Sequence, residues 1–167
     1  MKTLYIVFAN QLFRDEELRI PYEYYKKNNL NVILASNSMN TAVGKLGMHI
    51  DPDILYTDID ESKADGIMLV GGPGTKFYFE DKKLWDILKK FHSNKKIVAA
   101  ICISPVILAK SGLLKGKKAT VWIDGKEELE NNGATFVDSP VVVDGNIITA
   151  NGPKAAREFA ETVTKNL

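Results

Sequence analysis

The chain is organised around "KKIVAAICISPVIL", residues 95–108. The apolar run at residues 97–101 is short and rich in β-branched residues, which predicts a strand buried on both faces. Ser104 then offers an N-cap oxygen, and Pro105 fits the first turn of a helix that continues to a break at Gly112. Cys102 is therefore expected on a sharp turn from a central strand into a helix.

The composition is that of an ordinary globular protein with one domain, residues 1–167. Hydrophobic residues make up 45% of the chain and charged residues 26%, with a net charge of +1 and no basic block. Binding to nucleic acid or to an anionic membrane is therefore not expected. No segment approaches the roughly 20 apolar residues of a membrane span, and the N-terminus lacks a cleavage site. A single cysteine cannot form an internal disulfide, so a cytoplasmic protein is expected.

Strands and helices alternate along the chain. Core strands are expected at residues 3–9, 31–36, 65–72 and 97–101, followed by "KATVWI" (118–123) and a strand pair at 141–149 that turns on Asp144-Gly145. Helices are expected at residues 15–28, 81–92, 105–111 and 126–132, and from Pro153 onward. This alternation predicts an α/β, flavodoxin-like three-layer sandwich, with a mostly parallel sheet covered by helices on both faces. A hairpin at residues 41–50 is expected as a small antiparallel addition at one edge.

Three pieces of sequence fall where such a sheet binds ligands, outside the carboxyl ends of its strands. They are the turn at residues 9–17, the glycine turn "GGPG" at 71–74, and Cys102. The glycine turn lacks both the phosphate-loop lysine and the full dinucleotide fingerprint. It is either a plain tight turn or a place where backbone N–H groups approach a reacting atom.

Cys102 and Glu17 are the candidate chemical groups. A lone cysteine is often an inert buried hydrophobe, but a helix N-terminus favours the thiolate and lowers the thiol pKa. The N–H of Ile103 would also face an oxyanion at this turn. Glu17 is either a solvated carboxylate in a first helical turn or an inward group beside the cysteine. His49 and His92 are poor candidates for a base, and the acidic residues at 51–53 fit a turn better than a metal site.

Four motifs together resemble the ThiJ/PfpI superfamily, which includes the parkinsonism-associated protein deglycase and the PfpI-type intracellular proteases. They are "EELRIP" (16–21), "DGIMLVGGPG" (65–74), "AAICISPVILAKSGLLKGKKAT" (99–120) and "VVVDGNIITANGP" (141–153). The resemblance runs over nearly the whole chain. It implies a nucleophilic Cys102, a Glu17 hydrogen-bonded to its sulfur, and backbone N–H donors around Gly72 and Ile103. Gly71 and Trp122 would belong to the pocket.

Several positions depart from the family pattern. PfpI-type proteases carry a histidine directly after the cysteine, where this chain has Ile103, and an acidic residue beyond the glycine turn, where it has Lys76. Deglycase-like members carry a histidine after the next strand, at the position of Trp122. The usual elbow glycine is Ser104. A Glu17–Cys102 pair therefore remains without an adjacent histidine.

Three functions fit this pair. The thiol could respond to peroxide or add to a small aldehyde, as in a glyoxalase or deglycase, with Glu17 moving the proton. The protein could instead be a cysteine peptidase or amidase that takes its base from elsewhere in the molecule. It could also be a non-enzymatic holdase in which the cysteine only fills space. The expected partner is a small carbonyl compound or a peroxide, without a metal or other cofactor. The resemblance also implies a homodimer.

Overall fold

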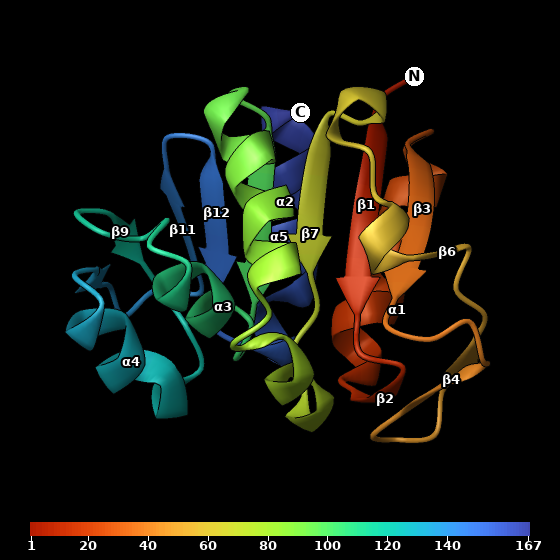
Figure 1. Ribbon diagram of the computed structural model, residues 1–167, viewed down its shortest axis with the longest axis horizontal. Coiled ribbons are helices and arrows are strands. Elements are labelled where there is room, and N and C mark those ends of the chain that lie inside the picture. The colour runs from red at the N-terminus through yellow and green to blue at the C-terminus, as the bar shows by residue number, and fades with distance from the viewer.

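A seven-stranded sheet forms the centre of the molecule (Figure 1). The computed structural model describes residues 1–167. The strands of this sheet are β1 (Thr3–Phe8), β3 (Asn31–Ser36), β6 (Ile54–Leu55), β7 (Gly66–Leu69), β8 (Ile97–Ile101), β11 (Val141–Asp144) and β12 (Ile147–Ala150). Their order is β11-β12-β8-β7-β1-β3-β6, and every neighbouring pair is parallel except β11 with β12. The five central strands β3-β1-β7-β8-β12 follow the flavodoxin order. The expected flavodoxin-like sheet is confirmed.

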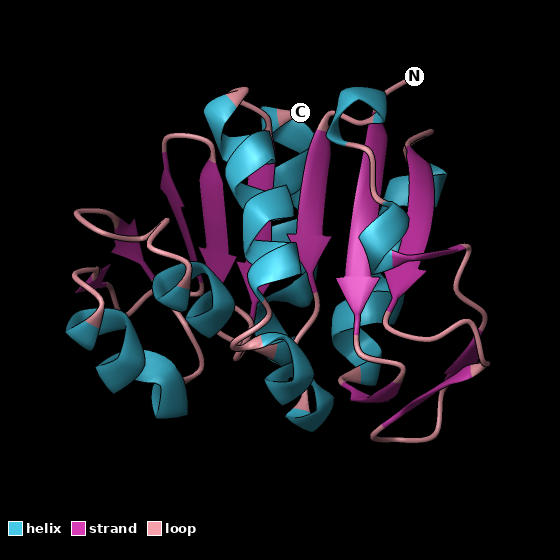
Figure 2. Cartoon of the chain, in the orientation of Figure 1, coloured by secondary structure: helices cyan, strands magenta, loops and turns pink.

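Helices cover both faces of this sheet (Figure 2). The α-helices are α1 (Asp15–Lys27), α2 (Lys82–Ser93), α3 (Pro105–Lys110), α4 (Lys126–Asn131) and α5 (Ala156–Asn166). Short 3-10 helices are η1 (Tyr56–Asp58), η2 (Glu61–Lys63), η3 (Pro73–Tyr78), η4 (Ile123–Gly125) and η5 (Pro153–Ala155). Helices α1 and α5 lie together behind the sheet in Figure 1, and α2 and α3 lie in front. The three-layer arrangement is therefore also confirmed.

The core divides into two layers because successive strand residues point to opposite faces of the sheet. Leu4 and Ile6 of β1 pack on the side of α1 and α5, together with Phe159. Tyr5 and Val7 of the same strand pack on the side of α2 and α3. Burial on both faces explains why the central strands read as continuous apolar runs rather than as alternating ones.

Two small sheets flank the central one. The first contains β2 (Gln11–Phe13), β4 (Ala42–Gly44) and β5 (His49–Ile50), and the second pairs β9 (Lys118–Ala119) with β10 (Thr135–Phe136). The hairpin expected at 41–50 forms as β4 and β5, but its place at the edge of the central sheet was wrong. Its turn is instead held by Asp15, whose carboxylate accepts from the Leu46 and Met48 N–H groups at 2.9 and 2.8 Å. The strand expected at "KATVWI" is reduced to the two residues of β9.

The outer edge of β3 is paired near its carboxyl end, by a two-residue strand and the turn before it. β6 pairs with only two residues of β3, Ala35 and Ser36. One residue earlier, the Asp53 carboxylate accepts from the Leu34 N–H at 2.8 Å, and the Asp53 N–H donates to the Leu34 carbonyl at 2.8 Å. The acidic turn at residues 51–53 therefore extends the pairing along the edge of β3 by one residue. None of the helices has the length and apolar character needed to span a membrane.

Candidate functional site

Cys102 occupies the turn between β8 and α3 in a left-handed backbone conformation, with φ of 65°. This region is costly for a residue with a Cβ, so the surrounding structure must hold it. The Cys102 N–H donates to the Ala150 carbonyl at 2.9 Å, and its carbonyl accepts from the Trp122 N–H at 2.7 Å. The nucleophile candidate is thus fixed from both sides on a strained elbow.

Ser104 stabilises the elbow from inside. The sequence predicted its side chain as an N-cap of α3, which was wrong: its backbone is already helical and its hydroxyl makes no cap bond. The fully buried hydroxyl accepts from the Ile101 N–H at 2.9 Å and lies 3.0 Å from the Leu69 carbonyl. It therefore ties the end of β8 to β7 where the chain turns.

Glu17 reaches the elbow from the first turn of α1. Its side chain is fully buried, and Oε1 accepts from the Gly71 N–H at 3.1 Å. Oε2 is buried without a hydrogen-bond partner. The Cys102 thiol lies close enough to favour the ionised carboxyl, although the pair does not meet the geometry of a regular hydrogen bond. The inward alternative for Glu17 is therefore the one that the structure shows.

Gly71 makes this approach possible. A Cβ at this position would lie 2.6 Å from the Cys102 Cβ, 2.6 Å from Glu17 Oε1 and 2.9 Å from the Ile101 carbonyl oxygen. Such distances are far inside van der Waals contact, so any side chain would force the two groups apart. Gly71 thus lies beneath the site, and it is not among the residues that line the open groove.

Burial sets the protonation of the pair. Desolvation raises the pKa of Glu17 to about 7 from an ordinary 4.5, and the Cys102 thiol and the Gly71 N–H only partly oppose it. Burial and then the Glu17 charge raise the pKa of the Cys102 thiol, while the Ile103 N–H and Arg14 lower it less. The lowered thiol pKa expected from the sequence was therefore wrong. Since each anion disfavours the other, the two groups titrate as a unit.

Two residues of the groove wall, Ile103 and Gly72, bring a backbone N–H to the same groove as Cys102. The Ile103 N–H faces the sulfur closely enough to favour the thiolate. Apart from this sulfur the Ile103 N–H has no acceptor within the protein, and the Gly72 N–H has none. Gly72 has φ of 110°, and a Cβ there would lie 2.5 Å from the Arg14 nitrogen. Both positions are thus available to a negatively charged oxygen.

The sulfur opens into a groove of about 920 Å³. Its lining residues are Arg14, Lys45, Gly72, Pro73, Lys76, Phe79, Cys102, Ile103, Val121, Trp122, Ile123, Asp124, Phe136, Asp138, Asn151, Gly152, Pro153 and Lys154. Trp122, predicted as core or pocket wall, lies half-exposed in this wall. Sequence reasoning missed Arg14 as a lining residue, although it belongs to the turn that was placed at the strand ends.

No histidine lines this groove. His92 ends α2 beside the start of β8, whereas Cys102 follows the end of that five-residue strand. About 16 Å of strand separates the two ends. His49 is exposed on β5. Ile103 and Trp122, the two positions at which the resemblance would place a histidine, both line the groove.

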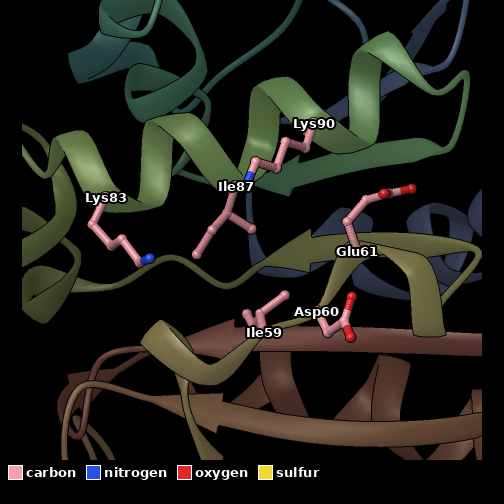
Figure 3. Close-up of a pocket in the computed structure, with 6 residues that line it drawn as sticks. All are labelled: Ile59, Asp60, Glu61, Lys83, Ile87 and Lys90. Carbon is pink, nitrogen blue, oxygen red and sulfur yellow. The ribbon is translucent and has the colours of Figure 1, made fainter.

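A second depression, of about 270 Å³, lies between η2 and α2 (Figure 3). It is lined by Ile59, Asp60, Glu61, Lys83, Ile87 and Lys90. Glu61 is occupied by an ion pair with Lys96 at 2.6 Å. The wall carries no cysteine or histidine, so the groove at Cys102 is the better candidate site.

Comparisons with known proteins agree with this fold. A family model described as the DJ-1/PfpI family matches residues 2–166. An uncharacterised protein of Methanocaldococcus jannaschii is 43% identical over 163 residues, which cover 96% of this chain and 80% of that protein. A deglycase of Pyrococcus horikoshii is 35% identical over 153 residues, covering 92% and 91%. The crystal structure of a ThiJ/PfpI domain protein from Brachyspira murdochii superimposes with a TM-score of 0.96 at 30% identity, covering 98% and 95%.

Proposed function

The chain belongs to the DJ-1/PfpI family, and on that premise we propose that Cys102 is a nucleophile for small reactive aldehydes, as in a glyoxalase or deglycase. Glu17 is proposed to carry the proton. The observation that supports this most directly is a buried carboxyl with a pKa near 7 and an unpaired oxygen, held against a thiol that opens into a groove. A carboxyl with such a pKa can both accept and donate a proton at neutral pH.

The first step is addition of the thiol to the carbonyl carbon. The thiol proton passes to the Glu17 carboxylate as the sulfur forms a bond to carbon. The π electrons of the carbonyl move to its oxygen, which faces the N–H groups of Gly72 and Ile103. Glu17 then returns the proton to this oxygen. The product is a hemithioacetal, and nothing has been oxidised or reduced.

With a 2-oxoaldehyde such as methylglyoxal, the same carboxyl could complete an isomerisation. Glu17 would remove the proton from the former aldehyde carbon and deliver it to the neighbouring carbonyl carbon, while the proton of the hemithioacetal hydroxyl moves to the neighbouring carbonyl oxygen. This internal transfer leaves a thioester, which water hydrolyses to lactate and the free thiol. The overall change is the addition of one water. Glu17 is assigned both transfers because the groove holds no histidine.

The relatives support a reaction of this class. The Pyrococcus horikoshii protein that resembles this chain over 92% of its length is named a deglycase. A peptidase or amidase is the alternative, and it is less well supported because no histidine lines the groove beside the cysteine. Hydrolysis of a peptide substrate that depends on Cys102 would favour that alternative over the proposed reaction.

The test is the consumption of methylglyoxal and the formation of lactate by the wild type, Cys102→Ser and Glu17→Gln. We expect Cys102→Ser to abolish turnover and Glu17→Gln to lower kcat by about 10²-fold or more, the usual contribution of a general acid–base. His49→Gln and His92→Gln serve as matched controls and should keep full activity. Turnover that survives in Cys102→Ser, with the fold verified by circular dichroism, would refute the assignment.

A second candidate is sensing of peroxide by the same thiol. It is favoured by the N–H groups of Gly72 and Ile103, which suit the oxygens of an oxidised sulfur. One peroxide would oxidise the thiolate to a sulfenate with release of water, and a second would give a sulfinate. Intact mass spectrometry should then show two added oxygens at Cys102 at low peroxide excess. A thiol that responds to peroxide fits the cytoplasm, where cysteines stay reduced. The expected homodimer can be tested by analytical ultracentrifugation.

A further inference from the structure

We infer that the groove at Cys102 selects carbonyl compounds that carry a negative charge close to the reacting carbon, such as 2-oxo acids and carboxylated aldehydes. This inference rests on the proposed function, because it names the substrate class of the same thiol.

Cationic side chains outnumber anionic ones around the sulfur. Arg14, Lys45, Lys76 and Lys154 line the groove, against Asp124 and Asp138. The four cations come from four separate segments of the chain, so the fold, and not a local run of lysines, gathers them. Lys45, Lys76 and Lys154 form no ion pair, which leaves their charge uncompensated by the protein. A groove lined by one sign of charge concentrates ligands of the other sign.

Arg14 is the cation best placed to contact a ligand beside the sulfur. Its backbone N–H donates to the Gly71 carbonyl at 2.9 Å, which fixes it to the glycine turn. Glu16 holds the guanidinium through two contacts, Nε to Oε2 at 2.8 Å and Nη2 to Oε1 at 3.3 Å. The remaining nitrogen, Nη1, has no acceptor in the protein. The positive charge of Arg14 also favours the ionised forms of Glu17 and Cys102, although less than the groups in direct contact with them do.

Lys76 strengthens the same preference. It lies in η3, directly after the glycine turn, and is exposed. Its ammonium lines the groove without an ion-pair partner, so it attracts a carboxylate on the substrate.

The test compares two alkylating reagents that differ mainly in charge. Iodoacetate is an anion and iodoacetamide is neutral, and with either one the sulfur forms a bond to carbon as iodide leaves. The rate constant for iodoacetate at Cys102 is divided by that for iodoacetamide. Dividing this ratio by the same ratio for free cysteine gives a normalised ratio that measures the preference of the groove for the anion. We expect a wild-type value of about fivefold, which corresponds to a few nearby screened charges.

Variants show whether the preference for the anion depends on the charges in the groove or on the net charge of the protein. Arg14→Gln and Lys76→Glu should each lower the ratio severalfold, and Glu16→Gln should raise it by releasing the guanidinium. Lys27→Glu is the control, because this exposed residue lies about 15 Å along α1 from Glu17. It changes the net charge as much as Lys76→Glu and should leave the ratio unchanged. Added salt should lower the wild-type ratio toward that of free cysteine.

The outcomes distinguish the two proposals. A normalised ratio near one in the wild type, with both reagents reacting, overturns the charge selectivity and leaves the nucleophile intact. A thiol that reacts with neither reagent overturns the proposed function, and the selectivity with it. Because Lys76 is an exposed side chain, its variant keeps the test available even where Arg14→Gln fails to fold.

Discussion

Replacing Glu17 by glutamine should remove a large pH dependence from the stability of this protein. The glutamine amide has nearly the shape of the carboxyl, and its oxygen can still accept from the Gly71 N–H. It cannot ionise, so the variant lacks the one proton equilibrium that burial shifts most strongly among the carboxyls. All other titrating groups remain, and the effects of those outside the Glu17–Cys102 pair cancel when the two proteins are compared. Burial alone already raises the pKa of the Cys102 thiol, so the thiol stays protonated over the pH range used here.

The magnitude follows from the shift of the pKa of Glu17, from 4.5 to about 7. Each pKa unit corresponds to about 1.4 kcal/mol, so the full effect is about 3 kcal/mol. The folded state binds the proton more tightly than the unfolded state does. The stabilisation is therefore complete below pH 4.5 and is lost progressively as the pH rises through 7. Above about pH 8 the difference becomes constant again.

The measurement is urea denaturation of the wild type and Glu17→Gln across this pH range, in the presence of a reductant. Circular dichroism follows unfolding, and equal slopes against urea show that both proteins expose the same surface. As the pH is raised from 4.5 to about 8, the free energy of unfolding of the wild type should fall by about 3 kcal/mol relative to that of the variant. A difference that stays flat with pH would show that Glu17 ionises at its ordinary pKa. A difference that grows in favour of the wild type would show that the carboxylate is the stabilised form.

Three further substitutions test the elbow. Ser104→Ala should lower the free energy of unfolding by about 2 kcal/mol, because it removes a buried hydroxyl that accepts from the Ile101 N–H and lies within hydrogen-bond distance of the Ile101 and Leu69 carbonyls. It should also slow alkylation of Cys102. A loss of stability below about 0.5 kcal/mol would contradict this role. Gly71→Ala should cost about 2 kcal/mol or more through overlap with Cys102 and Glu17, and normal methylglyoxal turnover in this variant would contradict the close approach. Cys102→Gly should be more stable than Cys102→Ala by about 1 kcal/mol in urea titrations, because only glycine adopts φ of 65° without strain; the reverse order would argue against a strained elbow.

The central sheet could be predicted from the sequence because each of its main elements carries a local pattern. The apolar run at 97–101 forms β8 and Pro105 begins α3, as the sequence indicated. The same patterns placed the carboxyl end of β8 beside the glycine turn after β7. Parallel strands bring such ends to one edge, which is why Cys102 and Gly71 could be expected close together.

The features that were missed depend on partners distant in sequence. Ser104 has the residue type of an N-cap, but its hydroxyl finds the Leu69 carbonyl, which is 35 residues away. Asp15 holds the hairpin turn by accepting from the Leu46 and Met48 N–H groups, and the sequence around Asp15 does not indicate these partners. The raised thiol pKa has the same origin, because helix-terminus arguments are local while burial and the Glu17 charge come from the assembled fold.

The two-residue strand β6 and the Asp53 turn restrict how copies of this molecule could associate. An unpaired strand edge is a template for a strand from another chain, and it is one route to uncontrolled polymerisation. Here the outer edge of β3 is already engaged at Leu34, Ala35 and Ser36 by groups from residues 53–55. A neighbouring chain would have to displace these bonds before it could extend the sheet on this side. Along this carboxyl-terminal half of β3, association must therefore use side chains, which evolution can tune residue by residue, and not continuous backbone pairing.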